Sequence, residues 1–197
     1  MNPRAFQLFD SALPIGSFNY SSGVEEAFYQ GYDVREFIEV AFKTVVLRGD
    51  AVIAKLSYED PYTADRVAYA SKLTRELKEM SVNMGRSLAR LDLCEDYFLR
   101  AVKEGRTRGT YPAVVGRVCL CLGIGKEECA LGVAYSELAT MAFSAVRLGA
   151  MTFYEAQKLI GRLLEEAEVG EEFEPSFPLL DLLSRLHERR EPKVFMS

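Results

Sequence analysis

The sequence has only one histidine, His187, and only four cysteines, Cys94, Cys119, Cys121 and Cys129, among its 197 residues. One histidine cannot build a typical zinc site, and His187 has no identifiable partner for a nucleophile–base pair. Cys119 and Cys121 point to different faces of an expected helix, so they cannot chelate together. We therefore expect no metal, no cofactor, four buried reduced thiols, and a surface His187 packed against the end of the chain.

Clustered positive charge is also scarce. The formal net charge is -5, which argues against nucleic acid as a partner. Arg106 and Arg108 form the only compact basic turn, and no aromatic residue accompanies them locally. We expect that turn to be a solvated loop.

Long apolar runs are missing too. Arg4 is not followed by an apolar signal core, because Asp10 interrupts a short mixed segment. The least charged long run, 129–146, is broken by Glu137. The sequence therefore predicts a cytoplasmic protein with no membrane segment.

Hydrophobic residues make up 49% of the chain and charged residues 27%, which are ordinary globular values. Apolar residues recur at helical spacing, and no run shows sustained period-two alternation. The sequence predicts an all-α fold, a single-domain helical bundle of roughly eight to ten helices over residues 1–197. The expected helices, taken from caps and stop residues, are 22–30, 33–48, 50–58, 63–91 with a bend near Gly85, 92–105, 112–122, 126–148, 152–168 and 178–190. A glutamate-rich stretch, 165–175, is expected to be a solvated connector.

The segment from Leu13 to Glu26 is the most distinctive part of the chain. Pro14 and Gly16 shape a non-repetitive turn, and Ser22 with Glu25 has the spacing of a capping box that opens a helix. The aromatic residues of this turn, Phe18 and Tyr20, are either pinned into the core or offered to a partner.

No self-sufficient catalytic set is evident. Residues 123–126 (GIGK) hint at a phosphate loop, but the full pattern needs Gly at 120 and Ser or Thr at 127, where this chain has Leu120 and Glu127. Glu137 stands alone in an apolar helix, so we expect it to pair with Arg117 or Arg147 or to face an interface. A catalytic acid is the less favoured reading, since no second carboxylate shares its face.

The segment from Leu13 to Glu25 closely resembles the opening signature of the urease accessory protein UreF family. Its sequence is LPIGSFNYSSGVE. The resemblance continues over essentially the whole chain, in elements that are weak individually: Arg75-Glu76, Met84-Gly85-Arg86, Tyr111 to Gly116, Arg147-Leu148, Gln157, His187-Glu188 and Phe195-Met196-Ser197. The family's closing Arg-Leu-Phe is replaced by Lys193-Val194-Phe195, which keeps the charge but loses the forked donor.

The resemblance implies a non-enzymatic chaperone of nickel insertion that dimerises, binds UreD (also called UreH) and recruits the GTPase UreG, so that nickel reaches apo-urease. It places the turn from Phe18 to Glu25 beside the dimer and UreG-facing region, with Glu25 facing a partner. It assigns the tail, residues 193–197, to docking on UreD, with an exposed Phe195 that needs a partner surface for order. The partner-binding residues implied in this way are Pro14, Gly16, Phe18, Tyr20, Ser21, Gly23, Glu25, Arg75, Arg86, His187, Lys193 and Phe195.

Two alternatives stay open at this point. The chain could be a small-molecule-binding helical protein or enzyme that uses Glu137 and a tyrosine-lined pocket. It could also be a UreF-like scaffold that serves another metalloenzyme.

Overall fold

A computed structural model describes residues 2–197, and these residues contain helices and no β-strand, as the helical spacing predicts. The elements are α1 (Pro3–Leu8), the 3-10 turn η1 (Ser17–Asn19), α2 (Val24–Tyr29), α3 (Val34–Ala41), the π-helical segment η2 (Phe42–Asp50), α4 (Ala51–Leu56), α5 (Pro61–Ser71), α6 (Arg75–Arg90), α7 (Tyr97–Lys103), α8 (Tyr111–Cys121), α9 (Lys126–Arg147), α10 (Phe153–Glu165) and α11 (Pro178–His187). Because α3, η2 and α4 form one unbroken rod, the described residues make ten helical rods.

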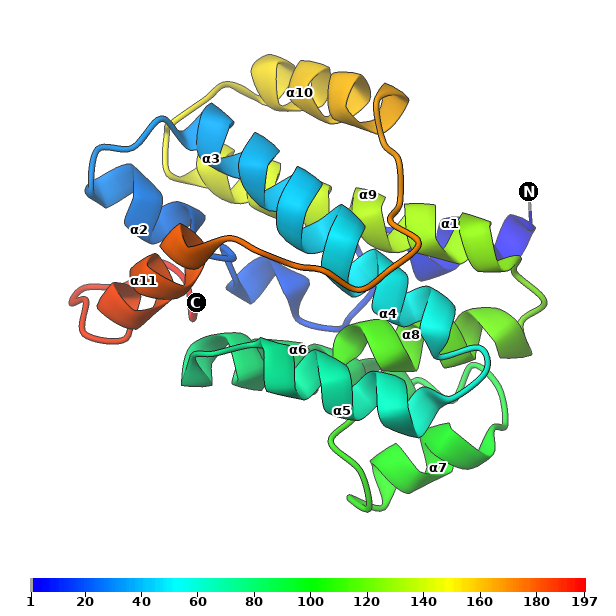
Figure 1. The fold of residues 1–197 in the computed structure, drawn as a ribbon. Coiled ribbons are helices and arrows are strands. Elements are labelled where there is room, and N and C mark those ends of the chain that lie inside the picture. The colour runs from blue at the N-terminus through cyan, green and yellow to red at the C-terminus, as the bar shows by residue number, and fades with distance from the viewer. Residues whose placement is uncertain (1) are drawn as a thin grey trace.

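The centre of the molecule is α8, which packs against α4, α5, α6 and α9 (Figure 1). Every residue of α8 from Tyr111 to Cys119 is buried, and the helix reaches solvent at its last two residues, Leu120 and Cys121. It approaches α4 closely, because a Cβ on Gly116 would lie 2.0 Å from the Ser57 Oγ atom. α9 covers α8 and α4 and carries α10 on its other side. The carboxyl terminus lies beside α2 and α11, far from the amino terminus (Figure 1).

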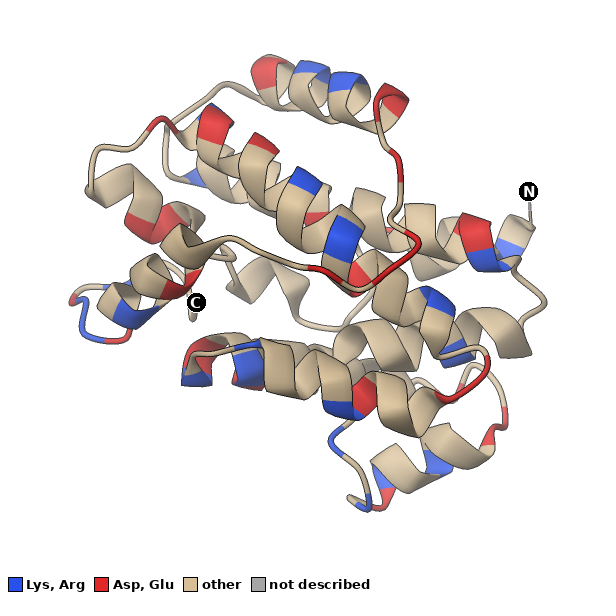
Figure 2. Ribbon diagram, viewed as in Figure 1, with Lys and Arg blue, Asp and Glu red and all other residues tan. Residues whose placement is uncertain are grey.

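The predicted break at Gly49 is wrong. Gly49 lies inside η2, and a Cβ there would come within 3.0 Å of the Pro175 ring. The connector between α10 and α11 crosses the rod at this point. The Gly170 amide donates to the Leu47 carbonyl at 2.9 Å, and the Glu174 amide donates to the Arg48 carbonyl at 3.0 Å. Glutamates recur along the connector (Figure 2), and they are exposed, as predicted, but the backbone of the connector is bound to the rod.

The single long helix predicted over 63–91 is in fact two helices. Thr74 caps α6 by accepting from the Leu77 amide, which separates it from α5. Gly85 makes no bend; it permits contact, because a Cβ there would lie 2.1 Å from the Gly109 carbonyl oxygen. Only glycine allows the backbone of the 106–110 turn to lie this close to α6.

Several predicted helix starts are confirmed. Asp33 caps α3, Pro112 lies in the first turn of α8, Thr152 and Glu155 form a capping box for α10, and Pro178 begins α11. The 123–126 segment is a turn between α8 and α9, as expected, and Lys126 pairs with Glu59 at 2.6 Å. Helix α1 was not predicted from the sequence.

The predicted pairing of Glu137 with Arg117 or Arg147 is wrong. Arg117 pairs instead with Asp96 at 2.5 Å, and Arg147 binds a backbone carbonyl. Glu137 lines a small cavity with Asp50 and Lys72, whose side chains pair at 2.9 Å. Burial, together with the Asp50 charge, raises the pKa of Glu137 well above its ordinary value.

The cysteine prediction is wrong for one pair. Cys94, in the loop before α7, forms a disulfide with Cys121 at the end of α8, while Cys119 and Cys129 are buried free thiols as expected. The local sequence could not reveal this pairing, because it depends on how the loop returns to α8.

α9 is long and apolar enough to cross a membrane by length and composition alone. More than half of its apolar window is buried inside the fold, where it packs against α4, α8 and α10. A core helix of this kind meets the same length and composition criteria, so α9 is read as part of the protein interior.

Candidate functional site

The amino-terminal turn is held by two glycines in the left-handed region. Gly16, with φ 84°, precedes η1, and Gly23, also with φ 84°, precedes α2. A Cβ on Gly23 would lie 2.6 Å from the Leu180 side chain, so this residue also allows α11 to approach α2. The predicted capping box is wrong: the Ser21 hydroxyl, and not that of Ser22, accepts from the Glu25 amide, at 3.2 Å.

The carboxyl-terminal tail closes onto this turn as an extra layer. The Ser197 carbonyl accepts from both the amide and the hydroxyl of Ser21, each at 2.6 Å. The Met196 amide donates to the Asn19 carbonyl at 2.7 Å. Residues 176 positions apart in the sequence therefore form one local structure.

Glu25 lies at the centre of this structure and is completely buried. Its carboxylate accepts from the Val194 amide at 2.8 Å and from the Phe195 amide at 2.9 Å. The Nε2 atom of His187 lies 2.9 Å from the same carboxylate. Glu25 therefore binds the tail backbone and α11 at once.

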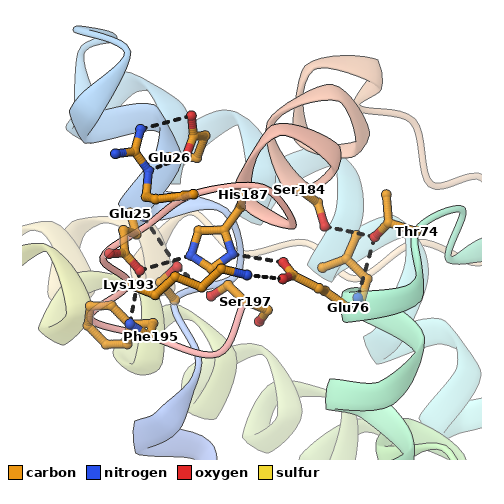
Figure 3. A network of polar contacts seen from close by, with 12 residues as sticks. Glu25, Glu26, Thr74, Glu76, Ser184, His187, Lys193, Phe195 and Ser197 are labelled. Atoms are coloured by element: carbon orange, nitrogen blue, oxygen red, sulfur yellow. Dashed lines mark hydrogen bonds and ion pairs between the residues drawn. The ribbon is translucent and has the colours of Figure 1, made fainter.

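His187 lies between two carboxylates, as Figure 3 shows. Its Nδ1 atom is 2.8 Å from Glu76, opposite the contact to Glu25. Both contacts are hydrogen bonds to ionised carboxylates only when both ring nitrogens carry hydrogens, so this geometry suits an imidazolium ion. Glu76 also accepts from the Lys193 ammonium at 2.7 Å.

A third ion pair completes the network. Arg190 donates to both carboxylate oxygens of Glu26, at 2.6 Å and 3.1 Å, and stacks 4.3 Å above the Tyr29 ring. Burial acts to raise the pKa of Glu26, but the hydrogen bonds from Arg190 and Gln30 outweigh it, and the pKa is lowered. With His187 protonated, three carboxylates face three cations, so the buried cluster is neutral overall.

The apolar end of the site is built around Phe195, which is only 3% exposed. The Arg147 guanidinium lies 4.1 Å from the centre of its ring and donates to the Phe18 carbonyl at 2.5 Å. Phe18 itself is 49% exposed. Arg147 thus joins the tail to the amino-terminal turn.

Four expectations about this region are wrong. His187 is 1% exposed and not a surface residue, and Phe195 is buried against its own chain. The tail needs no partner surface to become ordered, because Glu25 and Ser21 satisfy its backbone. Glu25 faces the tail and not a partner, since no part of it is exposed.

The structure brings together Ser21, Glu25, His187, Lys193 and Phe195 from the predicted site residues. Phe18 borders this network, because its carbonyl accepts from Arg147. The other six lie outside it: Pro14 and Gly16 in the turn, Gly23 at the start of α2, Tyr20 buried with its hydroxyl 3.3 Å from the Asn83 amide nitrogen, and Arg75 and Arg86 on α6.

The sequence interpretation missed Glu26, Glu76, Arg147 and Arg190 as members. Glu76 and Arg147 belong to short motifs of the resemblance, but the spacing of the four residues in the sequence carries no sign that they meet. The one usable signal was charge: carboxylates next to small or apolar residues in α2 and α6 require buried cations.

The chemistry of the cluster is structural in character. Each carboxylate is occupied by donors from α11, the tail, Arg190 or Gln30, and no group of three or more His, Cys, Asp or Glu residues within 2–197 is arranged to hold a metal ion. The arrangement holds the carboxyl-terminal tail against the amino-terminal turn and presents the outer surface of both.

Comparison with known proteins supports one family. The UreF family model matches residues 29–164. Proteins named urease accessory protein UreF from Yersinia pestis (strain Pestoides F) and Yersinia pseudotuberculosis serotype I (strain IP32953) are each 29% identical, over 98% of this chain and 97% of the relative. The Yersinia enterocolitica protein of the same name is 28% identical with the same coverage. The chain therefore belongs to the UreF family of urease accessory proteins.

Proposed function

We propose that this chain is a single-domain, non-enzymatic, cytoplasmic adaptor in urease maturation. It binds UreD (UreH) and the GTPase UreG, modulates UreG activity, and so helps nickel to reach apo-urease. Membership of the UreF family over the whole chain supports this function. The observation that carries it is the joint between the amino-terminal turn and the tail. There, a buried network of charged residues fixes the position of the exposed side chains of both segments.

The outer surface of this joint is apolar. Phe18 is 49% exposed, Val194 54% and Met196 61%, and they flank the buried Phe195. Exposed apolar side chains held on a rigid base are typical of protein interfaces. In this proposal, Phe18, Val194 and Met196 contact the partner protein, while Ser21, Glu25, His187, Lys193 and Phe195 position them.

Co-purification with UreD and UreG tests this assignment. Met196→Ser combined with Val194→Ser should weaken the complex while leaving the fold intact, and deletion of residues 193–197 should abolish UreD binding. Leu56→Ser is the matched control, because Leu56 is 43% exposed on α4, away from the joint. Complexes that assemble equally well with the tail variants would refute the proposed docking surface.

We also propose a homodimer. A groove of about 880 Å³ lies over α1 and α9, lined by Phe6, Leu131 and Tyr135, which are 69%, 44% and 38% exposed. Burial of such a surface stabilises association by about 25 cal/mol per Å² before the entropy of association is subtracted. Size-exclusion chromatography with light scattering should show a dimer, and a strict monomer at every concentration would contradict this part.

The alternative of a small-molecule site at Glu137 has no such support. The cavity beside Glu137 measures about 90 Å³, whereas ligand pockets usually hold about 300–1,000 Å³. The alternative of a scaffold for another metalloenzyme is tested by whether urease genes lie beside this one.

A further inference from the structure

A second charged site lies on the face formed by α5, α6, α11 and the 106–110 turn. A groove of about 560 Å³ opens there, lined by the basic side chains Arg75, Lys78, Arg86, Arg108 and Arg185. Glu79 is the one carboxylate in this lining. Figure 2 shows both basic and acidic residues on α6 and a run of acidic residues on the connector.

Tyr69 of α5 makes cation–π contacts with two of these basic side chains. The Lys78 ammonium lies 5.1 Å from the centre of its ring, and the Arg108 guanidinium lies 4.7 Å from the same centre. The two positive charges are therefore held within about 10 Å of each other, a Debye length at 0.1 M salt. The expectation that the basic turn has no aromatic neighbour is wrong, because α5 supplies one from a distant part of the sequence.

The positive charge of this groove is not neutralised by the chain itself. Arg75 lies 3.8 Å from Glu79, with both side chains more than half exposed, and such a pair contributes little. Within residues 2–197, the other four basic side chains of the groove have no carboxylate within 4 Å, and Arg86 donates only to the Arg108 carbonyl, at 3.2 Å. Like charges held together in this way raise the free energy of the unbound protein, and an anionic ligand would lower it.

We propose that this groove binds an acidic peptide segment, rich in glutamate or aspartate, of a partner protein. Arginine forks bind carboxylates with two parallel hydrogen bonds, and four of the five cations are arginines. Nucleic acid is the less suitable polyanion, because the chain carries a net charge of -5 and the basic residues form one confined groove without a longer stripe. That the partner is a urease maturation protein rests on the proposed function; the acidic segment rests on the groove alone.

The test uses a fluorescein-labelled deca-glutamate peptide and the full chain, with binding followed by fluorescence anisotropy. The wild-type protein should bind the peptide with an affinity that falls steeply between 0.05 and 0.3 M salt, because the contacts are exposed charge pairs. Lys78→Glu with Arg108→Glu should weaken binding by at least about tenfold. Arg90→Glu, an exposed reversal on the same helix outside the groove, should leave it unchanged.

A titration of the wild-type chain followed by NMR needs no variant, and the peptide should shift the amide signals of Lys78, Arg86 and Arg108. No binding, equal binding by the double variant, or tighter binding of a ten-nucleotide oligothymidylate than of the peptide would overturn the proposal. Because the peptide assay contains no accessory protein, its failure leaves the adaptor function standing, and failure of UreD or UreG binding leaves the groove proposal standing.

Discussion

Replacement of Glu25 by glutamine is the sharpest test of the joint between the amino-terminal turn and the tail. The change keeps the size of the side chain but removes the charge that accepts from two tail amides and faces His187. The amide group also points donors at donors. Glutamine keeps one acceptor oxygen, so either Val194 alone or Phe195 together with His187 loses its acceptor inside a fully buried site.

The magnitude follows from the contacts. A hydrogen bond to a charged group contributes about 1.5–3 kcal/mol, and removal of one partner from a buried ion pair costs about 3–5 kcal/mol. Because the three contacts share one carboxylate, they are not additive, and we expect a loss of about 3–5 kcal/mol. That is a large fraction of a typical unfolding free energy of about 5–15 kcal/mol.

The assay should separate local release from global unfolding. Amide hydrogen exchange of Val194, Phe195 and Met196 should become about 10²-fold or more faster, because each of these amides is bonded only while the tail is docked. Urea denaturation gives the global free energy of unfolding. Glu168→Gln, an exposed glutamate of the connector, is the matched control.

The reasoning would be refuted by a Glu25→Gln protein whose tail amides exchange at the wild-type rate and whose unfolding free energy lies within about 0.5 kcal/mol of wild type. That outcome would mean that the tail is held without Glu25, by Phe195 packing, worth about 1.5–3 kcal/mol, together with the contacts of Lys193, Met196 and Ser197.

Three further predictions concern the body of the fold. Glu137→Gln should stabilise the protein at pH 7. The folded pKa of Glu137 is raised above its unfolded value, so the free energy of unfolding of the wild type falls as the pH rises above the ordinary glutamate range. Urea unfolding at pH 4 and pH 7 should show a smaller fall of this free energy in the variant. Titration of the denatured, unreduced chain with a thiol reagent should find two free thiols, and Cys94→Ser with Cys121→Ser should cost about 3.5 kcal/mol from the loop of 27 residues. Gly85→Ala should lower the melting temperature strongly or prevent folding, since its Cβ would lie 2.1 Å from the Gly109 carbonyl, and overpacking of this kind costs about 1–3 kcal/mol or more.

The joint also changes how tail variants should be interpreted. Phe195→Ala removes a buried side chain, so a weakened complex would report on the shape of the joint and not on a direct contact. Met196 and Val194 are the informative positions, because their side chains are exposed and their substitution leaves the buried network in place. Partner binding and tail docking can therefore be separated experimentally.

The sequence by itself determined the helical class and most helix starts, because caps, prolines and apolar spacing act over three or four residues. Asp33, Thr152 and Pro178 show this, since each marks its helix through contacts within one turn. It also determined the family, through the segment from Leu13 to Glu25. The predictions of a helix stop at Gly49 and a bend at Gly85 failed, because Gly49 lies against the Pro175 ring and Gly85 against the Gly109 carbonyl, both distant in sequence.

Only the tertiary structure decided the site. Glu25, Glu76 and His187 come from α2, α6 and α11, and no local pattern relates positions that are separated by 51 and 111 residues. The same is true of Tyr69 beside Arg108 and of Cys94 beside Cys121. Local spacing specifies which residues share a helix face, whereas burial and charge balance act between elements and depend on how the helices pack.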